Sequence, residues 1–223
     1  MPGERPRYAV MWSGGKDSAL ALTRARARGL EVGLLLNVID PATERVRFHA
    51  TRKELIAAQA RAAGVPLRQL AVAWEGFDAA FRGALTRLKD EGLSGVIFGD
   101  IHLADVRAWY EDRVRAAGLD HIEPIWGEDP PALLREFVAG GGRAVVTCCE
   151  LGKLDEAWLG RTIDERFVRE IAAAGIDVCG ENGEYHSFAF DGPAFRTPVG
   201  WTAGERRREG GFVQLDLLPA ADR

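Results

Sequence analysis

A short polar segment, SGGKDS at residues 13–18, combines the residue types that bind phosphate groups. Two consecutive glycines allow a tight turn that exposes backbone N–H groups, and the lysine adds a positive charge. The segment follows an apolar run and precedes a helical pattern, and the amino-terminal end of a helix attracts anions. It is not a Walker A loop, because aspartate follows the lysine and the upstream glycine is missing. We therefore predict that residues 13–18, called the glycine loop below, bind the phosphates of a nucleotide.

A second polar segment, GENGEYHSF at residues 180–188, brings carboxylates and an imidazole together. On an extended chain Glu184 and His186 would share one face. A carboxylate pair formed by Glu181 and Glu184 could position ammonia and accept its protons. The same residue types also bind metal ions, and the Asn182-Gly183 pair is typical of a tight hairpin turn. The sequence leaves these alternatives open.

The elements that must position these segments alternate along the first two-thirds of the chain. Apolar runs predict strands at residues 8–12, 31–39, 67–74, 95–100, 121–126 and 143–149. Amphipathic patterns predict helices at residues 18–29, 51–64, 78–91 and 104–117, from residue 130, and around 163–171. This order predicts an α/β fold with a Rossmann-like, open and mostly parallel sheet that carries helices on both faces.

The pattern changes after about residue 175, where β segments joined by Gly/Pro-rich loops replace the helices. We therefore predict a nucleotide-binding domain over residues 1–175. Residues 176–223 are predicted to form a small β-rich C-terminal portion on the substrate side.

Polar residues near the ends of two predicted strands are further candidates, because ligands of open α/β sheets bind beyond the carboxyl ends of the strands. Asn37 is expected to border the adenosine. Gly99 and Asp100 end the fourth strand, and Asp100 is either an active-site residue or a helix cap. His49 lies in an apolar setting, where a single histidine is either structural or next to the nucleotide.

Composition narrows the classes of function. Apolar residues make up 47% of the chain, enough for a sizeable core, and the net charge of −4 disfavours a nucleic-acid partner. The three cysteines, Cys148, Cys149 and Cys179, have no disulfide or CxxC spacing. No apolar run has the length of a membrane span, and the first residues lack the core of a signal peptide. We predict a protein of the reducing cytoplasm without a membrane partner.

The glycine loop resembles the PP-loop of the N-type ATP pyrophosphatases, which belong to the adenine nucleotide α-hydrolase type. The stretch CGENGEYHSFAFDGPAF at residues 179–195 resembles the signature of the diphthine–ammonia ligase family. Shorter pieces follow in the family's order: FHA at 48–50, GDI at 99–101, EPIW at 123–126 and LGR at 159–161. Asn182 and His186 replace the usual glycine and acidic residue, and Trp109 stands where arginine is common. These departures resemble a short bacterial-type branch of the family.

The resemblance implies an ATP-dependent, AMP-forming carbon–nitrogen ligase that adenylates a carboxylate and amidates it with ammonia. In the family that carboxylate lies on a modified histidine of a protein. Asp17 is expected either to bind Mg²⁺ or to act as a helix first-turn acid. A homodimer is also expected. The implied site comprises nucleotide-binding residues (Ser13, Gly14, Gly15, Lys16, Asp17, Ser18, Asn37, His49, Gly99), catalytic residues (Lys16, Asp17, Asp100, Glu181, Glu184) and substrate residues (Arg107, Glu181, Asn182, Gly183, Glu184, His186).

Two other functions fit the glycine loop. A tRNA-thiolating enzyme with a PP-loop would need a basic face and, usually, a catalytic cysteine pair. A non-catalytic protein that binds adenine nucleotides would retain ATP or AMP without turnover.

Overall fold

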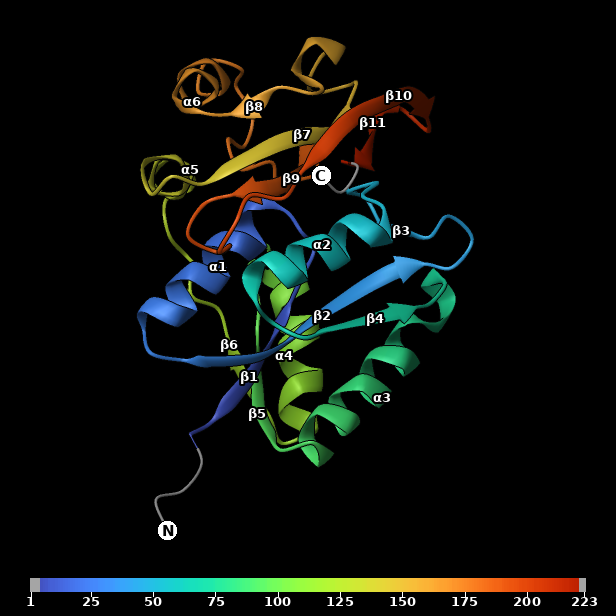
Figure 1. Cartoon of the computed structure of the whole chain (residues 1–223), viewed down its shortest axis with the longest axis vertical. Helices are drawn as coiled ribbons and strands as arrows, with labels where there is room; N and C mark the ends of the chain where they lie inside the picture. The colour runs from blue at the N-terminus through green and yellow to red at the C-terminus, as the bar shows by residue number, and fades with distance from the viewer. Residues whose placement is uncertain (1–4, 221–223) are drawn as a thin grey trace.

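Two β-sheets organise the computed structural model, which describes residues 5–220 (Figure 1). The first part of the chain forms β1 (Arg7–Met11), α1 (Lys16–Ala27), β2 (Glu31–Asp40), β3 (Arg45–Val46), α2 (Lys53–Ala63), β4 (Leu67–Ala71), α3 (Phe77–Asp90), β5 (Leu93–Ile97), α4 (Ala104–Ala116) and β6 (Asp120–Ile122). The second part forms α5 (Pro130–Ala139), β7 (Arg143–Glu150), β8 (Thr162–Ile163), α6 (Glu165–Ile171), β9 (Tyr185–Asp191), β10 (Trp201–Glu209) and β11 (Phe212–Pro219). Short 3₁₀ turns cover Trp74–Gly76 and Glu156–Trp158.

The first sheet, sheet A, has the strand order β3-β2-β1-β5-β6, and β4 also pairs with β2. All its pairings are parallel except that between β2 and the two-residue strand β3. The chain thus leaves each of the central strands β1, β2 and β5 at the same edge of the sheet. The glycine loop begins at this edge, directly after β1.

Alternating side chains of sheet A enter two separate apolar cores. Val10, Leu35 and Ile97 pack with α1 and α2, whereas their neighbours along the strands pack with α3 and α4. Helices therefore cover both faces, and the predicted Rossmann-like α/β architecture is confirmed. Within residues 5–220, no helix combines the length and apolar character needed to cross a membrane.

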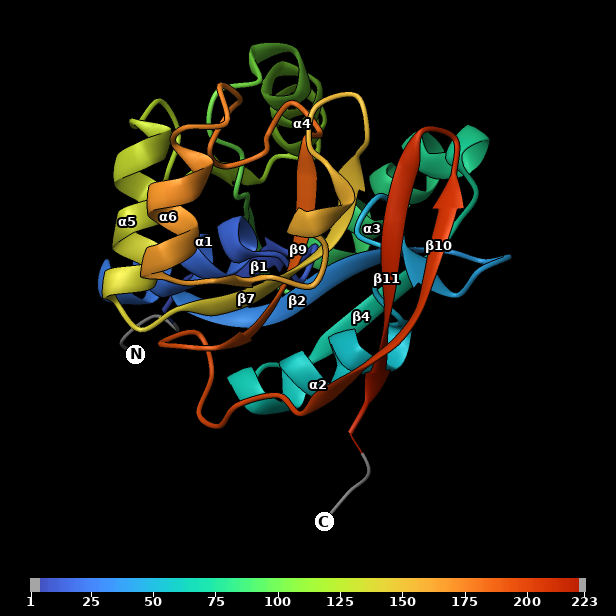
Figure 2. The same ribbon diagram turned by 90° about the horizontal axis from the view of Figure 1, so that it is seen from above.

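The second sheet, sheet B, is antiparallel and packs over α1 and α2 (Figure 2). It contains β7, β8, β9, β10 and β11, so the predicted β-rich tail is present. However, the strand expected at 143–149 lies here, as β7, and not in the parallel sheet. Six consecutive residues of β7 are buried, and such an apolar run fits the centre of either kind of sheet. Sheet B thus draws on both sides of residue 175, and a domain boundary at that position stays a prediction.

Three predicted strands end earlier than expected: the one at 95–100 ends at Ile97, so Gly99 and Asp100 follow the strand and do not end it. The strand predicted at 67–74 ends at Ala71, and only Asp120–Ile122 is extended where 121–126 was predicted. In both places the apolar run continues into a turn, where Trp74 and Trp126 have left the sheet. An apolar side chain there guarantees neither an extended backbone nor burial, since Trp74 is 59% exposed.

Candidate active site

A cavity of about 750 Å³ opens beyond the carboxyl ends of β1, β2 and β5. This volume lies in the range of roughly 300–1,000 Å³ that is usual for small-molecule sites. Sheet A, α3 and α4 form one part of its wall, and the segment from Cys179 to Ser187 forms another. The predicted site residues that line it are Ser13, Lys16, Asp17, Ser18, Asn37, His49, Gly99, Asp100, Glu181 and His186.

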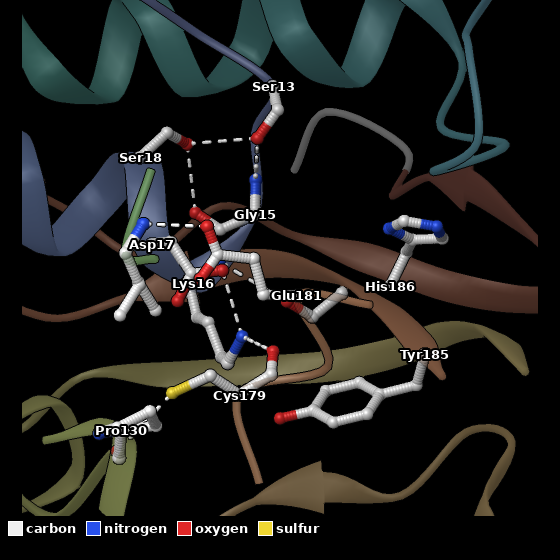
Figure 3. A network of polar contacts seen from close by, with 12 residues as sticks. Ser13, Gly15, Lys16, Asp17, Ser18, Pro130, Cys179, Glu181, Tyr185 and His186 are labelled. Carbon is white, nitrogen blue, oxygen red and sulfur yellow. Dashed lines mark hydrogen bonds and ion pairs between the residues drawn. The ribbon is translucent and has the colours of Figure 1, made fainter. Parts of the chain in front are cut away.

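The glycine loop is closed by its own serines (Figure 3). The Gly15 N–H donates to Ser13 Oγ at 3.2 Å, and Ser18 Oγ donates to the Gly15 carbonyl at 3.0 Å. Ser13 Oγ in turn donates to Ser18 Oγ at 3.3 Å. Helix α1 then begins at Lys16, with Gly15 as its N-cap. The loop thus presents the positive end of a helix dipole and two hydroxyl groups, as anion binding requires.

Both glycines of the loop are required by close packing. Gly14 has φ +83°, and a Cβ atom there would lie 2.6 Å from Ile56 Cδ1 and 2.7 Å from Gln59 Oε1. A Cβ atom on Gly15 would lie 2.8 Å from Cε1 of His49. Because glycine has no side chain, any contact of Gly14 or Gly15 with a ligand would come from the backbone.

Lys16 points from the loop towards the segment at 179–185 (Figure 3). Its side chain is almost fully buried, and Nζ donates to Asp17 Oδ2 at 2.8 Å and to the carbonyl oxygen of Cys179. Nζ also lies 5.0 Å from the ring centroid of Tyr185. Burial disfavours the charged form, but the Asp17 carboxylate more than offsets this and raises the pKa of Lys16. The lysine therefore carries a fixed positive charge in the cavity.

Strand β9 of sheet B forms hydrogen bonds with the glycine loop. The Lys16 N–H donates to Ser187 Oγ at 3.2 Å, and the Ala189 N–H donates to the Gly14 carbonyl at 2.8 Å. Gln59, fully buried on α2, connects the same parts. Its Nε2 donates to the carbonyls of Gly14 (2.9 Å) and Ala189 (2.6 Å), while its Oε1 accepts from the Trp12 indole at 2.8 Å.

Gln59 and Ser187, which hold the glycine loop, were not predicted from the sequence. Gln59 gave a readable signal, because it interrupts the apolar stripe of the helix that also contains Leu55 and Ile56. A polar side chain in a buried stripe must find hydrogen-bond partners inside the protein. Ser187 gave no comparable signal, since only the fold brings β9 next to residues 13–18.

Three carboxylates gather near the start of α1. Burial, together with the nearby charges of Glu181 and Asp17, raises the pKa of Asp100 to about 7. The pKa of Glu181 is also raised, chiefly by burial, although its carboxylate accepts from the backbone N–H groups of Ile101 (2.7 Å) and His102 (3.1 Å). Gly99 allows the segment before Asp100 to pass close to Asp17, because a Cβ atom on Gly99 would lie 3.0 Å from the backbone of Asp17.

His49 and His186 line the cavity side by side, with ring centroids 4.8 Å apart. The Ser187 carbonyl can only accept, so His49 Nδ1, 3.0 Å away, carries the proton. Burial lowers the pKa of both imidazoles. Asn37 is fully buried and satisfied, with Nδ2 donating to the Trp12 carbonyl at 2.8 Å. Asn37 therefore fixes the ends of β1 and β2 at the edge of the cavity.

Four predicted substrate residues lie outside the cavity lining. Arg107 pairs with Glu123 at 3.1 Å and stacks on Trp126 at 4.5 Å. Glu184 is buried away from the cavity, where Oε1 accepts from the Asp177 N–H at 3.4 Å. Asn182 and Gly183 form a turn before β9, and Gly183 has φ +86°. Glu184 precedes β9 and His186 lies within it. Only His186 lines the cavity, so the two side chains do not form one site.

The segment formed by β3 and the residues that connect it to α2, residues 45–52, contributes to the cavity wall and is called the mouth loop. Its ends are held by Asp216 of β11, which pairs with Arg45 at 2.7 Å and with Arg52 at 2.6 Å. At the middle of the loop the Phe48 side chain is 62% exposed. The mouth loop is therefore fixed at both ends and open to solvent in its centre.

All three cysteines are buried thiols. Cys148 and Cys149 lie in β7 and do not line the cavity. Cys179 does line it, but its Sγ donates to the Pro130 carbonyl at 3.3 Å, and burial raises the pKa of the thiol to about 12. A reactive thiolate is thus disfavoured at the one cysteine near the glycine loop.

Comparisons with known proteins agree with this arrangement. Residues 6–121 match the family model of the diphthamide synthase N-terminal domain, and residues 129–216 match that of the diphthamide synthase C-terminal domain. The chain is 27% identical to diphthine–ammonia ligase of Homo sapiens over 219 residues, covering 86% of this chain and 82% of the relative. It is 26% identical to diphthine–ammonia ligase of Rattus norvegicus with the same coverage. With that of Danio rerio it shares 24% identity, covering 86% of this chain and 85% of the relative.

Proposed function

The chain belongs to the diphthamide synthase family, and on that premise we propose that it is an ATP-dependent carbon–nitrogen ligase that adenylates a carboxylate and amidates it with ammonia. One observation carries the proposal. The glycine loop and the segment at 179–187 meet in one cavity, where Lys16 of the loop donates to the Cys179 carbonyl. A phosphate-binding loop and a carboxylate-bearing segment are thus within reach of one bound nucleotide.

In the first step a carboxylate oxygen of the acceptor attacks the α-phosphorus of ATP, the bond to the β-phosphate breaks, and pyrophosphate leaves with the electron pair. The hydroxyls of Ser13 and Ser18 and the backbone of Gly14 and Gly15 hold the phosphates. Lys16 supplies a buried positive charge where negative charge builds on the leaving group, which lowers the barrier. Its contacts with Asp17 and Cys179 keep that charge in place before ATP arrives.

Mg²⁺ fits the same region. Among the described residues, six carboxylates line the cavity (Asp17, Glu75, Asp78, Asp100, Asp105, Glu181) against two fixed cations (Lys16, Arg47). A nucleotide adds further negative charge, so a divalent cation is needed for balance, and carboxylate oxygens suit Mg²⁺. We propose that Asp17 holds it, with Asp100 as its neighbour. The bound ion would supply charge compensation for the phosphates.

In the second step ammonia attacks the acyl carbon, the bond to AMP breaks, and AMP leaves with the electron pair. The nitrogen must lose a proton, and a base with a pKa near the working pH accepts it best. Asp100, which lines the cavity and whose pKa is raised to about 7 chiefly by burial, is proposed to be that base. Glu181, which faces the same cavity, is proposed to orient the ammonia. Glu184 and Arg107 are not assigned a direct role, because neither lines the cavity.

Three finer points remain proposals. The acceptor carboxylate is proposed to lie on a protein, on the resemblance that the segment at 179–195 carries. A homodimer is proposed on the general tendency of such folds to self-associate. A cytoplasmic location is supported by the three unpaired thiols.

The test is product analysis with ATP, Mg²⁺, ¹⁵N-ammonium and fractionated cell extract as the source of acceptor. The expected products are AMP and pyrophosphate in equal amounts, with ¹⁵N in an acceptor amide. Formation of ADP and phosphate would rule the proposal out. Retention of ATP with no turnover in any fraction would favour the non-catalytic alternative, whereas thiolated tRNA is not expected because Cys148 and Cys149 lie outside the cavity.

A further inference from the structure

Phe48 has an arrangement that folding alone does not explain. Its ring is 62% exposed, and its backbone has φ +65°, in the left-handed region that residues with a Cβ atom rarely adopt. Ala50, two residues later, has φ +56°. The exposed ring buries little apolar surface, so burial does little to offset the cost of this backbone conformation. Such outliers cluster at ligand clamps, where a bound molecule supplies the missing contacts.

The ring of Phe48 faces a second ring across the edge of the cavity. The centroids of Phe48 and His186 are 6.1 Å apart, their planes differ by 28°, and both side chains line the cavity. A flat ring inserted between them would need about 3.5 Å on each side. A flat ring therefore fits between them only once the two rings have moved apart.

The two walls of this slot differ in stiffness. His186 lies within β9, opposite Cys148 of β7, and the ring of His49 packs against it at 4.8 Å. Phe48 instead lies at the middle of the mouth loop, whose ends are fixed by Asp216. One wall is thus rigid, and the other can move while its attachment points stay in place.

The slot adjoins the glycine loop. Ser187, next to His186, accepts from the Lys16 N–H, and a Cβ atom on Gly15 would lie 2.8 Å from the His49 ring. The apolar side chains of Val38 and Val46 also line the cavity. We propose that Phe48 and His186 sandwich the adenine ring of the bound nucleotide. This assignment rests on the proposed function, because it requires ATP at the glycine loop.

Trp74, the other exposed aromatic residue at the mouth, is less suited to this role. Its ring already stacks on Phe77, with centroids 5.8 Å apart and planes within 7°, and the Arg47 guanidinium lies 5.1 Å from its centroid. Among the described residues, the Phe48 ring stacks only on His186. A ligand that covered the exposed ring would add contacts that it lacks. The two residues therefore form a matched pair for an experiment.

The experiment measures, by titration calorimetry, the dissociation constants of ATP, AMP and tripolyphosphate. Phe48→Ala should weaken ATP and AMP about tenfold, because stacking against a base is lost. The affinity for tripolyphosphate, which has no base, should stay within about twofold of wild type, since the substitution touches no phosphate-binding group. Phe48→Trp should retain wild-type affinity, and Trp74→Ala should leave all three affinities unchanged. The exposure of Phe48 means that its replacement leaves no internal cavity, which thermal melting will check.

Equal weakening of ATP and tripolyphosphate by Phe48→Ala would overturn the inference, as would unchanged affinity for ATP. Loss of ATP binding in Trp74→Ala and not in Phe48→Ala would place the base elsewhere and overturn it as well. If the wild-type protein bound no ATP, both the inference and the proposed function would fall. If it bound and cleaved ATP but Phe48→Ala had no effect, only the inference would fall.

Discussion

The inner end and the mouth of the cavity are built in opposite ways. At the inner end, residues 13–18 are held by their own serines, by Gln59 and by β9, with hydrogen bonds of 2.8–3.3 Å. At the mouth, Phe48 and Trp74 are more than half exposed and are held mainly by ring contacts. Preorganised donors stabilise a reacting phosphate without further rearrangement. Exposed rings, in contrast, become ordered when a ligand covers them. The difference indicates that chemistry belongs to the inner end and ligand capture to the mouth.

Removing the buried charge at the inner end should have the largest effect. Lys16→Met keeps most of the side-chain volume but loses the charge that is proposed to face the leaving pyrophosphate, so kcat should fall by about 100-fold or more. Lys89→Met on α3, outside the cavity lining, is the matched control and should retain wild-type kcat. Steady-state release of AMP measures both. A Lys16→Met enzyme with kcat within threefold of wild type would contradict the role assigned to the inner end.

The next effect concerns the connection between the sheets. Gln59→Leu removes the donor to the carbonyls of Gly14 and Ala189 and leaves the Trp12 indole without an acceptor. Unpaired buried groups cost about 1–3 kcal/mol each, so the free energy of unfolding should drop by about that amount. If the bonds also preorganise the glycine loop, kcat/KM for ATP should fall about tenfold.

The isosteric Gln59→Glu variant sharpens this test. Its carboxylate can still accept from Trp12 but faces two carbonyl oxygens, so it should lower kcat/KM further than leucine does. Urea unfolding and initial rates separate stability from function. A stability loss in both variants with unchanged kcat/KM would reduce Gln59 to a purely structural residue.

The same contrast explains how much the sequence could predict. Within residues 13–18, residue types and the strand–helix context predicted the local structure, because a glycine turn between a strand and a helix is specified by neighbours in sequence. The parallel sheet followed from the alternation of strands and helices. Asp100 was placed correctly at the cavity, since the carboxyl end of β5 leads there in any such sheet. Each of these predictions depended on local pattern or on a general rule of topology.

The remaining features depend on contacts between distant parts of the chain. β7 has the same apolar pattern as a parallel strand, and only its pairing with β8, β9 and β11 assigns it to sheet B. Arg107 forms an ion pair with Glu123, a pairing that their separation in sequence did not indicate. Glu184 was expected beside His186, but the turn through Gly183 and the entry into β9 send the two side chains to different environments. Neither polarity nor spacing encodes such pairings.

The smallest expected effect on activity concerns the two ion pairs of Asp216, which fix the ends of the mouth loop. Their contribution to stability depends on pH. Asp216 is buried between Arg45 and Arg52, and although burial alone would raise its pKa, the two guanidinium groups hold it well below its ordinary value. A carboxyl group with a lowered folded-state pKa stabilises the fold above its unfolded pKa of about 3.9. This contribution disappears as the pH falls through the folded-state pKa.

Asp216→Asn should therefore lower the free energy of unfolding at pH 7 by about 2–3 kcal/mol, because it leaves two arginines unpaired. The difference from wild type should shrink below pH ~4, because the unfolded wild-type chain then binds a proton at Asp216 that the folded carboxylate does not. Glu156→Gln is a matched control, since Glu156 also pairs with two arginines, Arg206 and Arg208, but on the exposed side of β10. It should change stability much less at every pH, because solvent screens exposed pairs. Denaturant unfolding between pH 3 and 8 measures both variants. A penalty for Asp216→Asn that is equal at all pH values would mean that packing, and not charge, fixes the ends of the mouth loop.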